Sequence, residues 1–478
     1  MTVQQTANGT VTEWPGLTGD DAERAGEMVR LVAERLADPV AVARIAGDPS
    51  NREPVYGSIL WQPMALSHGY PGTALLYAEL SEFDPKWTPA LHTHLQAAMT
   101  EMPKHPANGL FFGPGAVAAA VQVGAGSVGR YRRLRERLFA WLVRDQIDRL
   151  AAHTQRAEAG GIGVSWAAYD VINGLSGTGR LLLAAAADDA FDGAAEALTA
   201  TLRHLVRLSK PIEVRGVQVP GWWIPPELQP VEEDQQTYPD GDFNLGMAHG
   251  VAGPLTLLAL AEQHGWSVPG QREAIRRMAE WLCGWVLHDD AGTYWPCRVS
   301  WAEQTGTRPD SLFTRTAWCY GAPGVATALY RAGVVFGEES WQSIALDGLR
   351  SALRREESQW RLDGPTLCHG YAGFMQILWR IGLAADDPEL LAGARRVARR
   401  VLDFADPAAP FVFHHVTPDS PEGWRTATGR RELNVAGVLE GAAGVALALL
   451  SVTPPRFVGT DSETTAWVPR WDRVLMLS

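Results

Sequence analysis

The sequence predicts an all-α fold in which inner and outer helices alternate, with small β or loop insertions. The first observation is a Gly-x-x-Gly motif that recurs along the chain, each time followed by small and apolar residues. The second is that stretches between the motifs, such as REAIRRMAEWLCGWV, place apolar residues three and four positions apart, which is the period of an amphipathic helix. Together these observations predict a series of helical hairpins.

Seven copies of the motif follow one another, and one of them has Phe112 at the first glycine position while keeping Gly115 at the second. Glycine lacks a Cβ atom, so it lets the starts of inner helices crowd near a shared axis. A loose helical solenoid with glycine caps is the alternative that the repeat alone leaves open. The copies are SHGYPGTALL from Ser67, FFGPGAVAAA from Phe111, NGLSGTGRLLL from Asn173, AHGVAGPLTLL from Ala248, CYGAPGVATAL from Cys319, CHGYAGFMQIL from Cys368 and LEGAAGVALAL from Leu439.

Two long intervals between copies predict insertions. Residues about 211–243 combine short alternating segments with several prolines and two adjacent tryptophans, and residues about 407–433 form a second interval of this kind. Neither has the length or pattern of an independent core, so we expect one main domain. The expected segments are an N-terminal extension with a first helix over 1–50, a barrel over 51–455 and a C-terminal segment over 456–478.

The bulk composition is that of an ordinary globular protein, with 478 residues of which 46% are hydrophobic. A net charge of -12 argues against a general nucleic-acid-binding protein, because phosphate neutralisation requires clustered Lys and Arg. Residues 1–15 do not have the pattern of a signal peptide, and no apolar run approaches the ~18 residues of a spanning helix. We therefore expect a cytoplasmic protein. Its four cysteines make no disulfide framework.

Side chains suited to catalysis or metal binding stand at the mouths of several repeats. They are Asp170 before VINGLSG, His249 in MAHGVAG, Cys319 in WCYGAPG, and Cys368 with His369 in LCHGYAG. If the repeats close into a ring, these residues come from the same end of equivalent helices and converge on one cavity. Two thiolates and an imidazole form a three-ligand Zn²⁺ set that leaves a fourth position for substrate.

The charge of such a site indicates its chemistry. Two cysteine thiolates already neutralise Zn²⁺, so a third incoming thiolate would leave an electron-rich centre that is a poor Lewis acid. That centre would still hold a sulfur deprotonated and nucleophilic at neutral pH. The set therefore predicts alkylation or addition of a thiol rather than hydrolysis. The spacing differs from that of a zinc ribbon, and the prediction depends on the nearly matching positions of Cys319 and Cys368 in successive repeats.

The same residue types also occur in purely structural roles. Cys283 in WLCGWV and Cys297 in WPCRVS have apolar neighbours and do not stand at a repeat mouth, so we expect both to be core residues. A structural zinc bound by all four cysteines is the rival interpretation. The thiols at positions 319 and 368 remain the candidates for metal binding.

The histidines and the aspartate have structural alternatives as well. His249 could form a hydrogen bond at a helix start, and Asp170 could be a carboxylate stabilised by a helix dipole. We interpret His68, which shares the His-Gly setting, as a structural echo of the repeat. His414 and His415 lie in an insertion, where they could face substrate or solvent.

Five stretches carry a family resemblance that runs from about residue 67 to residue 445, namely DVINGLSG, VPGWWIPPELQ, TYPDGDFNLGMAHGVAGP, RTAWCYGAPG and CHGYAG. With them the chain resembles the LanC-type lanthionine synthetases, or lanthipeptide cyclases, and in particular the stand-alone cyclases of class I pathways. The resemblance implies an α/α-barrel, or toroid, of seven helical hairpins with Zn²⁺ in its central cavity.

The resemblance also implies an activity. Members of the family add a peptide cysteine thiol to a dehydroalanine or dehydrobutyrine of the same precursor, which forms the (methyl)lanthionine thioether rings of a lantibiotic. An imidazole with a pKa near ~6.5 suits the proton transfer that this addition needs. The residues matched by motif are Cys319, Cys368 and His369 as zinc ligands, His249 and Asp170 as the acid/base pair, and Arg315 and Tyr320 as further site residues.

The expected partners follow from the same resemblance. No dehydratase or kinase portion precedes the cyclase region, so we expect a separate dehydratase to make the acceptor, and an export transporter that holds the enzyme in a complex peripheral to the membrane. The substrate would be a dehydrated precursor peptide with leader and core. The segment PGWWIPPELQ is a candidate leader-binding surface, because we expect its prolines and its tryptophans Trp222 and Trp223 to be exposed.

Three other functions are compatible with parts of this pattern. A LanC-like transferase that adds glutathione to dehydroamino acids would use the same site with another substrate. A non-catalytic helical barrel that binds peptides is less consistent with a complete set of ligands and acid/base groups. A zinc prenyltransferase would need a basic cluster for a diphosphate, and the repeat mouths do not contain one.

Overall fold

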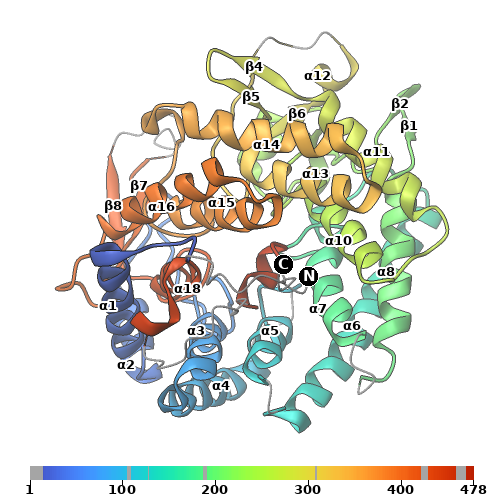
Figure 1. The fold of residues 1–478 in the computed structure, drawn as a ribbon. Helices are drawn as coiled ribbons and strands as arrows, with labels where there is room; N and C mark the ends of the chain where they lie inside the picture. The colour runs from blue at the N-terminus through green and yellow to red at the C-terminus, as the bar shows by residue number, and fades with distance from the viewer. Residues whose placement is uncertain are drawn as a thin grey trace, which may run out of the picture.

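The computed structural model describes residues 14–104, 109–126, 129–186, 191–306, 309, 311–420, 429–458 and 470–478. Within these ranges, an inner ring of seven helices forms the body of the protein (Figure 1). Each inner helix packs against the next, and α18 packs against α3, so the ring closes and the predicted α/α-barrel is confirmed. The inner helices are α3 (Tyr70–Phe83), α5 (Pro114–Gly124), α7 (Leu175–Ala186), α10 (Ala252–Gln263), α13 (Ala322–Phe336), α15 (Tyr371–Ala385) and α18 (Ala442–Val452).

An outer helix covers each inner one. The outer helices are amphipathic: α16 buries Leu390, Ala394, Val397 and Val401 at intervals of three and four residues, whereas α10 is buried throughout residues 252–261. The seventh pair joins two distant parts of the chain, because α1 packs on α18 and α16. The outer helices are α4 (Thr88–Glu101), α6 (Arg132–Glu158), α8 (Ala194–Leu208), α11 (Gln271–Gly284), α14 (Glu339–Arg354), α16 (Pro388–Leu402) and α1 (Gly19–Arg35).

Backbone hydrogen bonds link the loops before the inner helices into a second, smaller ring. In each of the seven repeats a backbone N–H donates to a carbonyl of the following repeat, and the last repeat donates to the first. The N···O distances run from 2.9 to 3.5 Å. The bonds run from Leu66 to Phe111, Phe111 to Ile172, Val171 to Ala248, Ala248 to Cys319, Cys319 to Cys368, Cys368 to Leu439 and Val438 to Leu66.

The second glycine of the motif is required because the preceding loop passes very close to the backbone at this position. A Cβ atom at Gly373 would lie 1.9 Å from the carbonyl oxygen of Leu367, and one at Gly444 would lie 1.8 Å from that of Val438. The loop before each of these helices therefore folds back onto the first helical turn, and any side chain there would displace it. This fold-back places the residues before the motif at the axis of the barrel.

In the described part of the chain, four two-stranded antiparallel sheets decorate the ring. β1 and β2 lie in the predicted insertion at 211–243, and β7 and β8 lie in the one at 407–433, of which residues 421–428 fall outside the described part. The sheets pair β1 (Ile212–Val214) with β2 (Val217–Val219), β3 (Asp242–Asn244) with β6 (Arg298–Ser300), β4 (Leu287–Asp289) with β5 (Gly292–Tyr294) and β7 (His415–Pro418) with β8 (Arg430–Leu433).

The short α-helices are α2 (Pro39–Ala46), α9 (Glu232–Thr237) and α12 (Trp301–Thr305). Short 3-10 helices span Pro85–Trp87, Met102–Lys104, Trp166–Ala168, Pro226–Leu228, Glu357–Gln359, Pro455–Phe457 and Trp471–Leu475.

The idea that Trp222 and Trp223 are exposed is wrong. Their side chains are only 2% and 5% exposed. Trp222 packs edge-on against Trp281 with ring centroids 5.2 Å apart, and Trp223 packs in the same way on Trp301 at 5.6 Å. The two tryptophans anchor the insertion to α11 and α12, so they are not available as a peptide-binding surface.

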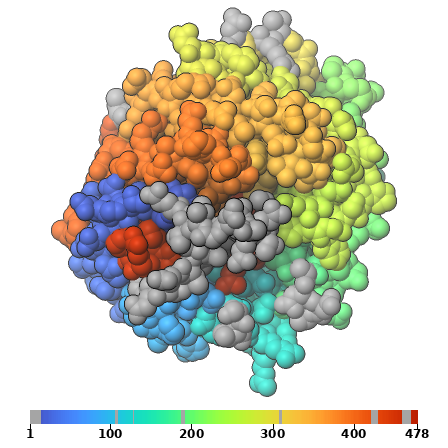
Figure 2. All heavy atoms as spheres, viewed as in Figure 1, coloured from blue at the N-terminus to red at the C-terminus, as the bar shows by residue number. Residues whose placement is uncertain are grey.

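The C-terminal segment 470–478 packs against the inner ring. Its 3-10 helix Trp471–Leu475 contacts α3, α5 and α7, and part of the segment reaches the surface at the centre of the face in Figure 2, in dark red. Trp318, the residue before Cys319, donates its indole N–H to the carbonyl oxygen of Leu475 at 2.9 Å. The segment is thereby joined to a loop that carries a candidate metal ligand. No helix in the described ranges is both long and apolar enough to cross a membrane.

Replacing Asp472 with alanine is expected to destabilise the barrel by about 3–5 kcal/mol, because it removes a fully buried carboxylate that pairs with the Arg380 guanidinium. Asp472 is fully buried, and it accepts hydrogen bonds from Arg380 Nη2 at 2.8 Å and Gln376 Nε2 at 2.9 Å. Urea unfolding followed by circular dichroism would measure the change. Asp403→Ala is the control: this carboxylate is 54% exposed and lies 3.9 Å from Arg24, so its loss should cost below about 1 kcal/mol. Equal midpoints for the two variants would contradict the structural role of the segment.

Candidate active site

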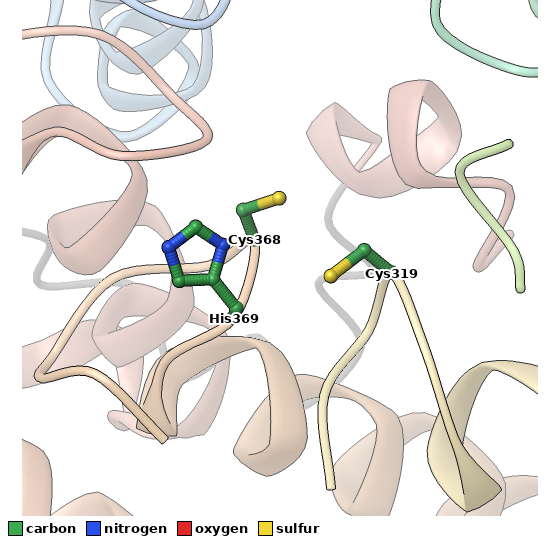
Figure 3. A group of neighbouring side chains, drawn as sticks. All are labelled: Cys319, Cys368 and His369. Atoms are coloured by element: carbon green, nitrogen blue, oxygen red, sulfur yellow. The ribbon is translucent and has the colours of Figure 1, made fainter. Parts of the chain in front are cut away.

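The two candidate thiols and the candidate imidazole lie together at the axis of the barrel. Cys319 and Cys368 each stand two residues before the first glycine of their repeat, and the Cys319 N–H donates to the Cys368 carbonyl oxygen at 3.3 Å. The donor atoms of Cys319, Cys368 and His369 all lie within 4.8 Å of one another. Figure 3 shows the two sulfurs projecting from neighbouring loops into the same space, with one ring nitrogen of His369 on their side and the other facing away.

The pKa values of the two thiols move in opposite directions. The Cys368 thiol donates a hydrogen bond to the sulfur of Cys319, which lowers the pKa of Cys319 and raises that of Cys368. Burial lowers the pKa of His369, but the hydrogen bond to Cys319 and the negative charges of Glu440 and Cys319 together outweigh burial and leave the pKa raised. Two thiols and one imidazole, buried and within reach of a common centre, are a donor set that could bind a metal ion.

His249 and Asp170 form a second unit at the mouths of the third and fourth repeats. His249 Nδ1 lies 2.6 Å from Asp170 Oδ2, and the fully buried Asp170 also accepts the Asn173 backbone N–H on Oδ1 at 2.8 Å. Trp166 stacks on the His249 ring, with centroids 4.0 Å apart and planes at 19°. The imidazole is thus fixed on one edge and one face, while 21% of the side chain stays accessible. This is the arrangement of an oriented acid/base group.

Arg315 is held between two parts of the chain. Its Nε and Nη2 donate to the Arg361 carbonyl oxygen at 3.0 and 2.8 Å, and Nη2 also pairs with Asp363. The second oxygen of Asp363 pairs with Arg430 of β8. Burial raises the pKa of Asp363, but Arg315, His369 and Arg430 outweigh it and leave the pKa lowered. Through Arg430, the insertion that carries β8 thus helps to position the positively charged Arg315 near the thiols.

Tyr320 directly follows Cys319 in the chain. Its hydroxyl accepts a hydrogen bond from Asn244 Nδ2 at 3.1 Å. Burial raises the pKa of Tyr320, so the phenol is neutral and can donate a proton in a hydrogen bond. Neighbouring Arg298, which sequence reasoning did not single out, pairs with Asp242 and Asp234 and lies 5.9 Å from the Trp166 ring. The pairing of β3 with β6 brings it there, a contact that no local pattern indicates.

A further cluster adjoins His369 on the side away from the thiols. Glu440 stands immediately before the first glycine of the seventh repeat, the position that His369 occupies in the sixth. Its carboxylate pairs with His68, and its Oε1 lies 4.0 Å from His369 Nε2. His415 of β7 packs edge-on to His369 with ring centroids 6.0 Å apart. Repeat alignment could have identified Glu440, because that position carries a polar side chain in most copies.

His415 is buried, so it does not face solvent, and burial lowers its pKa to about 4. Its neighbour His414 is only partly buried. Within the described ranges, neither Cys283 nor Cys297 belongs to a group of converging metal-ligand atoms. Cys297 is buried and Cys283 is partly buried against the core. Burial raises the pKa of Cys283 to about 11 and that of Cys297 to about 12, as expected of unreactive thiols.

Comparison with known proteins places the chain in a family. The family model of lanthionine synthetase C-like proteins matches residues 60–456, which is most of the chain. The chain belongs to the lanthionine synthetase C-like family. It is 25% identical over 323 residues to the nisin biosynthesis protein NisC of Lactococcus lactis subsp. lactis, a match that covers 66% of this chain and 72% of the relative. A solved structure of nisin cyclase is similar in fold, with a TM-score of 0.67, 22% sequence identity, and coverage of 87% of this chain and 92% of that one.

Proposed function

We propose that this lanthionine synthetase C-like protein is a cyclase that adds peptide cysteine thiols to dehydroalanine or dehydrobutyrine residues and so forms (methyl)lanthionine rings. The observation that carries the proposal is the convergence of Cys319, Cys368 and His369 within 4.8 Å at the axis of the barrel. The similarity to a nisin biosynthesis protein supports the same function. A thiol-rich metal site suits chemistry at sulfur, as opposed to the activation of water.

Zinc is the metal that best suits the three donors. Two thiolates and an imidazole are ligands that Zn²⁺ prefers, and three protein ligands are typical of a catalytic site with one open position. When bound, Zn²⁺ would lower the pKa of a substrate thiol at that position and hold its sulfur as a thiolate. The burial of Cys319 and the partial burial of Cys368 would keep competing water away from the reacting sulfur.

His249 is the proposed proton donor. The substrate sulfur attacks the β-carbon of the dehydroamino acid, the electron pair of the double bond moves to the α-carbon and its carbonyl, and the α-carbon then takes a proton. His249 can deliver that proton, because Asp170 fixes its Nδ1 edge at 2.6 Å and Trp166 its face. Both oxygens of the buried Asp170 have partners, which favours an orienting role over acceptance of the thiol proton. Proton transfer of this kind contributes about 10²–10⁴-fold to a rate.

Arg315 and Tyr320 would stabilise the charge that develops on the enolate oxygen. Arg315 brings a fixed positive charge near the thiols, held by Asp363 and the Arg361 carbonyl. Tyr320 brings a neutral phenol whose raised pKa keeps its proton available for a hydrogen bond. Preorganised donors of both kinds are worth most in a buried site.

The proposed substrate is a dehydrated precursor peptide that carries a leader and a core. A separate dehydratase would supply its unsaturated residues, since the reaction consumes a dehydroamino acid and this site has no means to make one. A transporter would export the product, and the proposed location is the cytoplasm, peripheral to the membrane within a biosynthetic complex. The chemistry of the reaction and membership of the family support these proposed partners.

Incubation with a dehydrated, cysteine-containing precursor tests the proposal. We expect free thiols to disappear while the peptide mass stays unchanged, because intramolecular addition neither gains nor loses atoms. Parallel reactions with free glutathione would instead give adducts of increased mass if the protein were an intermolecular transferase. An unchanged thiol content with a precursor matched to this enzyme, at full zinc occupancy, would refute the cyclase function.

A further inference from the structure

The carboxylate of Glu440 lies where it can act on a metal-binding histidine. The backbone places it there: Cys368 donates its N–H to the carbonyl oxygen of Leu439 at 2.9 Å, so the sixth and seventh repeat mouths are adjacent. Glu440 Oε1 is 4.0 Å from His369 Nε2. Figure 3 shows that one nitrogen of this ring faces the two sulfurs and the other faces away.

His68 holds Glu440 in this position. Its Nε2 contacts the Oε2 atom of Glu440, and its Nδ1 lies 3.0 Å from Ser67 Oγ. The two oxygens of the carboxylate are therefore directed differently, one toward His68 and one toward His369. Since His68 belongs to the first repeat and Glu440 to the seventh, the contact spans the point at which the ring closes.

We propose that Glu440, held by His68, is a positioning residue that orients His369 so that Nδ1 faces the metal. The inference rests on the proposed metal site and adds Glu440 and His68 to it as supporting residues. Histidines that bind a metal donate their other ring N–H to a carboxylate, a carbonyl or water, and this fixes both the tautomer and the ring orientation. At 4.0 Å the carboxylate can reach that N–H by a small movement or through one water molecule.

His415 supports the same arrangement from the remaining side. It comes from β7, is buried, and packs edge-on against the His369 ring at a centroid distance of 6.0 Å. A ring confined by His415 on one side and directed by Glu440 on another has little freedom to rotate. The insertion that carries β7 thereby contributes to the order of the metal site.

The same side chains could be read as a second metal site. Donor atoms of His369, His415 and Glu440 lie within 4.8 Å of one another. Two features favour positioning instead. A second ion on Nε2 would require His369 to bind metals through both nitrogens and so to lose both ring protons, and Glu440 is already engaged by His68. The two readings differ in metal stoichiometry, one ion per chain against two.

The test is zinc affinity, measured on the full-length protein by competition with a chromogenic chelator. Glu440→Gln keeps the size of the side chain and removes its charge, and we expect zinc to bind about 10–100-fold more weakly. The absorption bands of the cobalt(II)-substituted protein should also shift, because the orientation of a ligand changes. Glu79→Gln is the matched control: it alters another buried carboxylate, one that accepts the Arg470 N–H at 2.7 Å near the C-terminal segment, and should leave zinc affinity unchanged.

Each possible result either supports or overturns the positioning role of Glu440. Wild-type zinc affinity and an unchanged cobalt spectrum in Glu440→Gln would overturn the proposal, as would two zinc ions in the wild type that fall to one in the variant. Should Glu440→Gln fail to fold, as judged by the thermal unfolding of the metal-free protein, His68→Ala is the second variant, with a smaller loss of affinity expected and wild-type affinity as the contrary result. Because affinity is measured without substrate, a wild type that binds zinc but forms no rings would refute the cyclase function alone.

Discussion

The Cys319→Ala variant is expected to lose both its metal and its ability to form thioethers. Cys319 is one of three donors within 4.8 Å, and it carries the greater thiolate character because the neighbouring Cys368 thiol donates a hydrogen bond to it. With one sulfur removed, only two protein donors remain, too few to hold a catalytic zinc. Loss of the several kcal/mol that a bound metal contributes should slow cyclisation at least about 100-fold. Elemental analysis and thiol titration of the precursor would measure the two losses.

Cys283→Ala is the control for that experiment. Cys283 is a half-buried thiol on α11, and burial raises its pKa to about 11, so it has no role in the site. This variant should retain one zinc per chain and wild-type cyclisation. If Cys319→Ala kept its zinc, or if both variants lost it, the assignment of the ligands would be wrong.

The His249→Asn variant is expected to keep its zinc and lose about 10²–10⁴-fold in cyclisation rate. Its imidazole is held by Asp170 at 2.6 Å and by the stacked Trp166 ring, which is the arrangement required to deliver a proton in one direction. The His249 side chain lies outside the group of thiol and imidazole donors, so metal content should stay at the wild-type level. Single-turnover rates and zinc content, measured on the same sample, separate the two effects.

Two further variants sharpen this prediction. Asp170→Asn keeps the shape of the partner but removes its charge, so the rate should fall in the same direction with zinc retained. His92→Asn alters an exposed histidine of α4 and should cyclise at the wild-type rate. A His249 variant with wild-type turnover would remove it from the mechanism, and one that lost zinc would assign it to metal binding instead.

Much of the fold could be predicted because its cause is local. A glycine is needed wherever a helix start meets its own preceding loop, as at Gly373, where a Cβ atom would lie 1.9 Å from the Leu367 carbonyl oxygen. That requirement recurs in most repeats, so the sequence shows the inner helices directly. The outer helix that covers α18 is harder to predict from the sequence. This helix, α1, carries no motif, and its place as the seventh outer helix results from ring closure between residues far apart in the chain.

The residues of the candidate site also differ in how far the repeat predicts their positions. Cys319 and Cys368 occupy equivalent places in successive repeats, so their proximity follows from the repeat itself. Glu440 occupies an equivalent place too, but glutamate before a glycine reads as a solvated side chain until its neighbours His68 and His369 are known. Arg430 and His415 come from an insertion that has no repeat register, and nothing in the local sequence directs them toward the axis.

The burial of Trp222 and Trp223 shows how a local reading can mislead. Adjacent tryptophans among prolines are typical of an exposed binding loop, yet here each ring fills a gap beneath the insertion, against Trp281 and Trp301. A large aromatic side chain contributes most when it is buried, so a loop that lacks regular hydrogen bonding can be anchored by such rings. Sequence alone does not distinguish an anchor from a contact surface.

X-ray absorption at the zinc edge of the purified protein tests the central claim most directly, namely that Cys319, Cys368 and His369 bind one zinc ion together. We expect two sulfur scatterers near ~2.3 Å and nitrogen or oxygen scatterers near ~2.0–2.1 Å, with one zinc per chain. The Cys368→Ala protein should lose this signal. A first coordination sphere without sulfur, or one made of four sulfurs, would contradict the account.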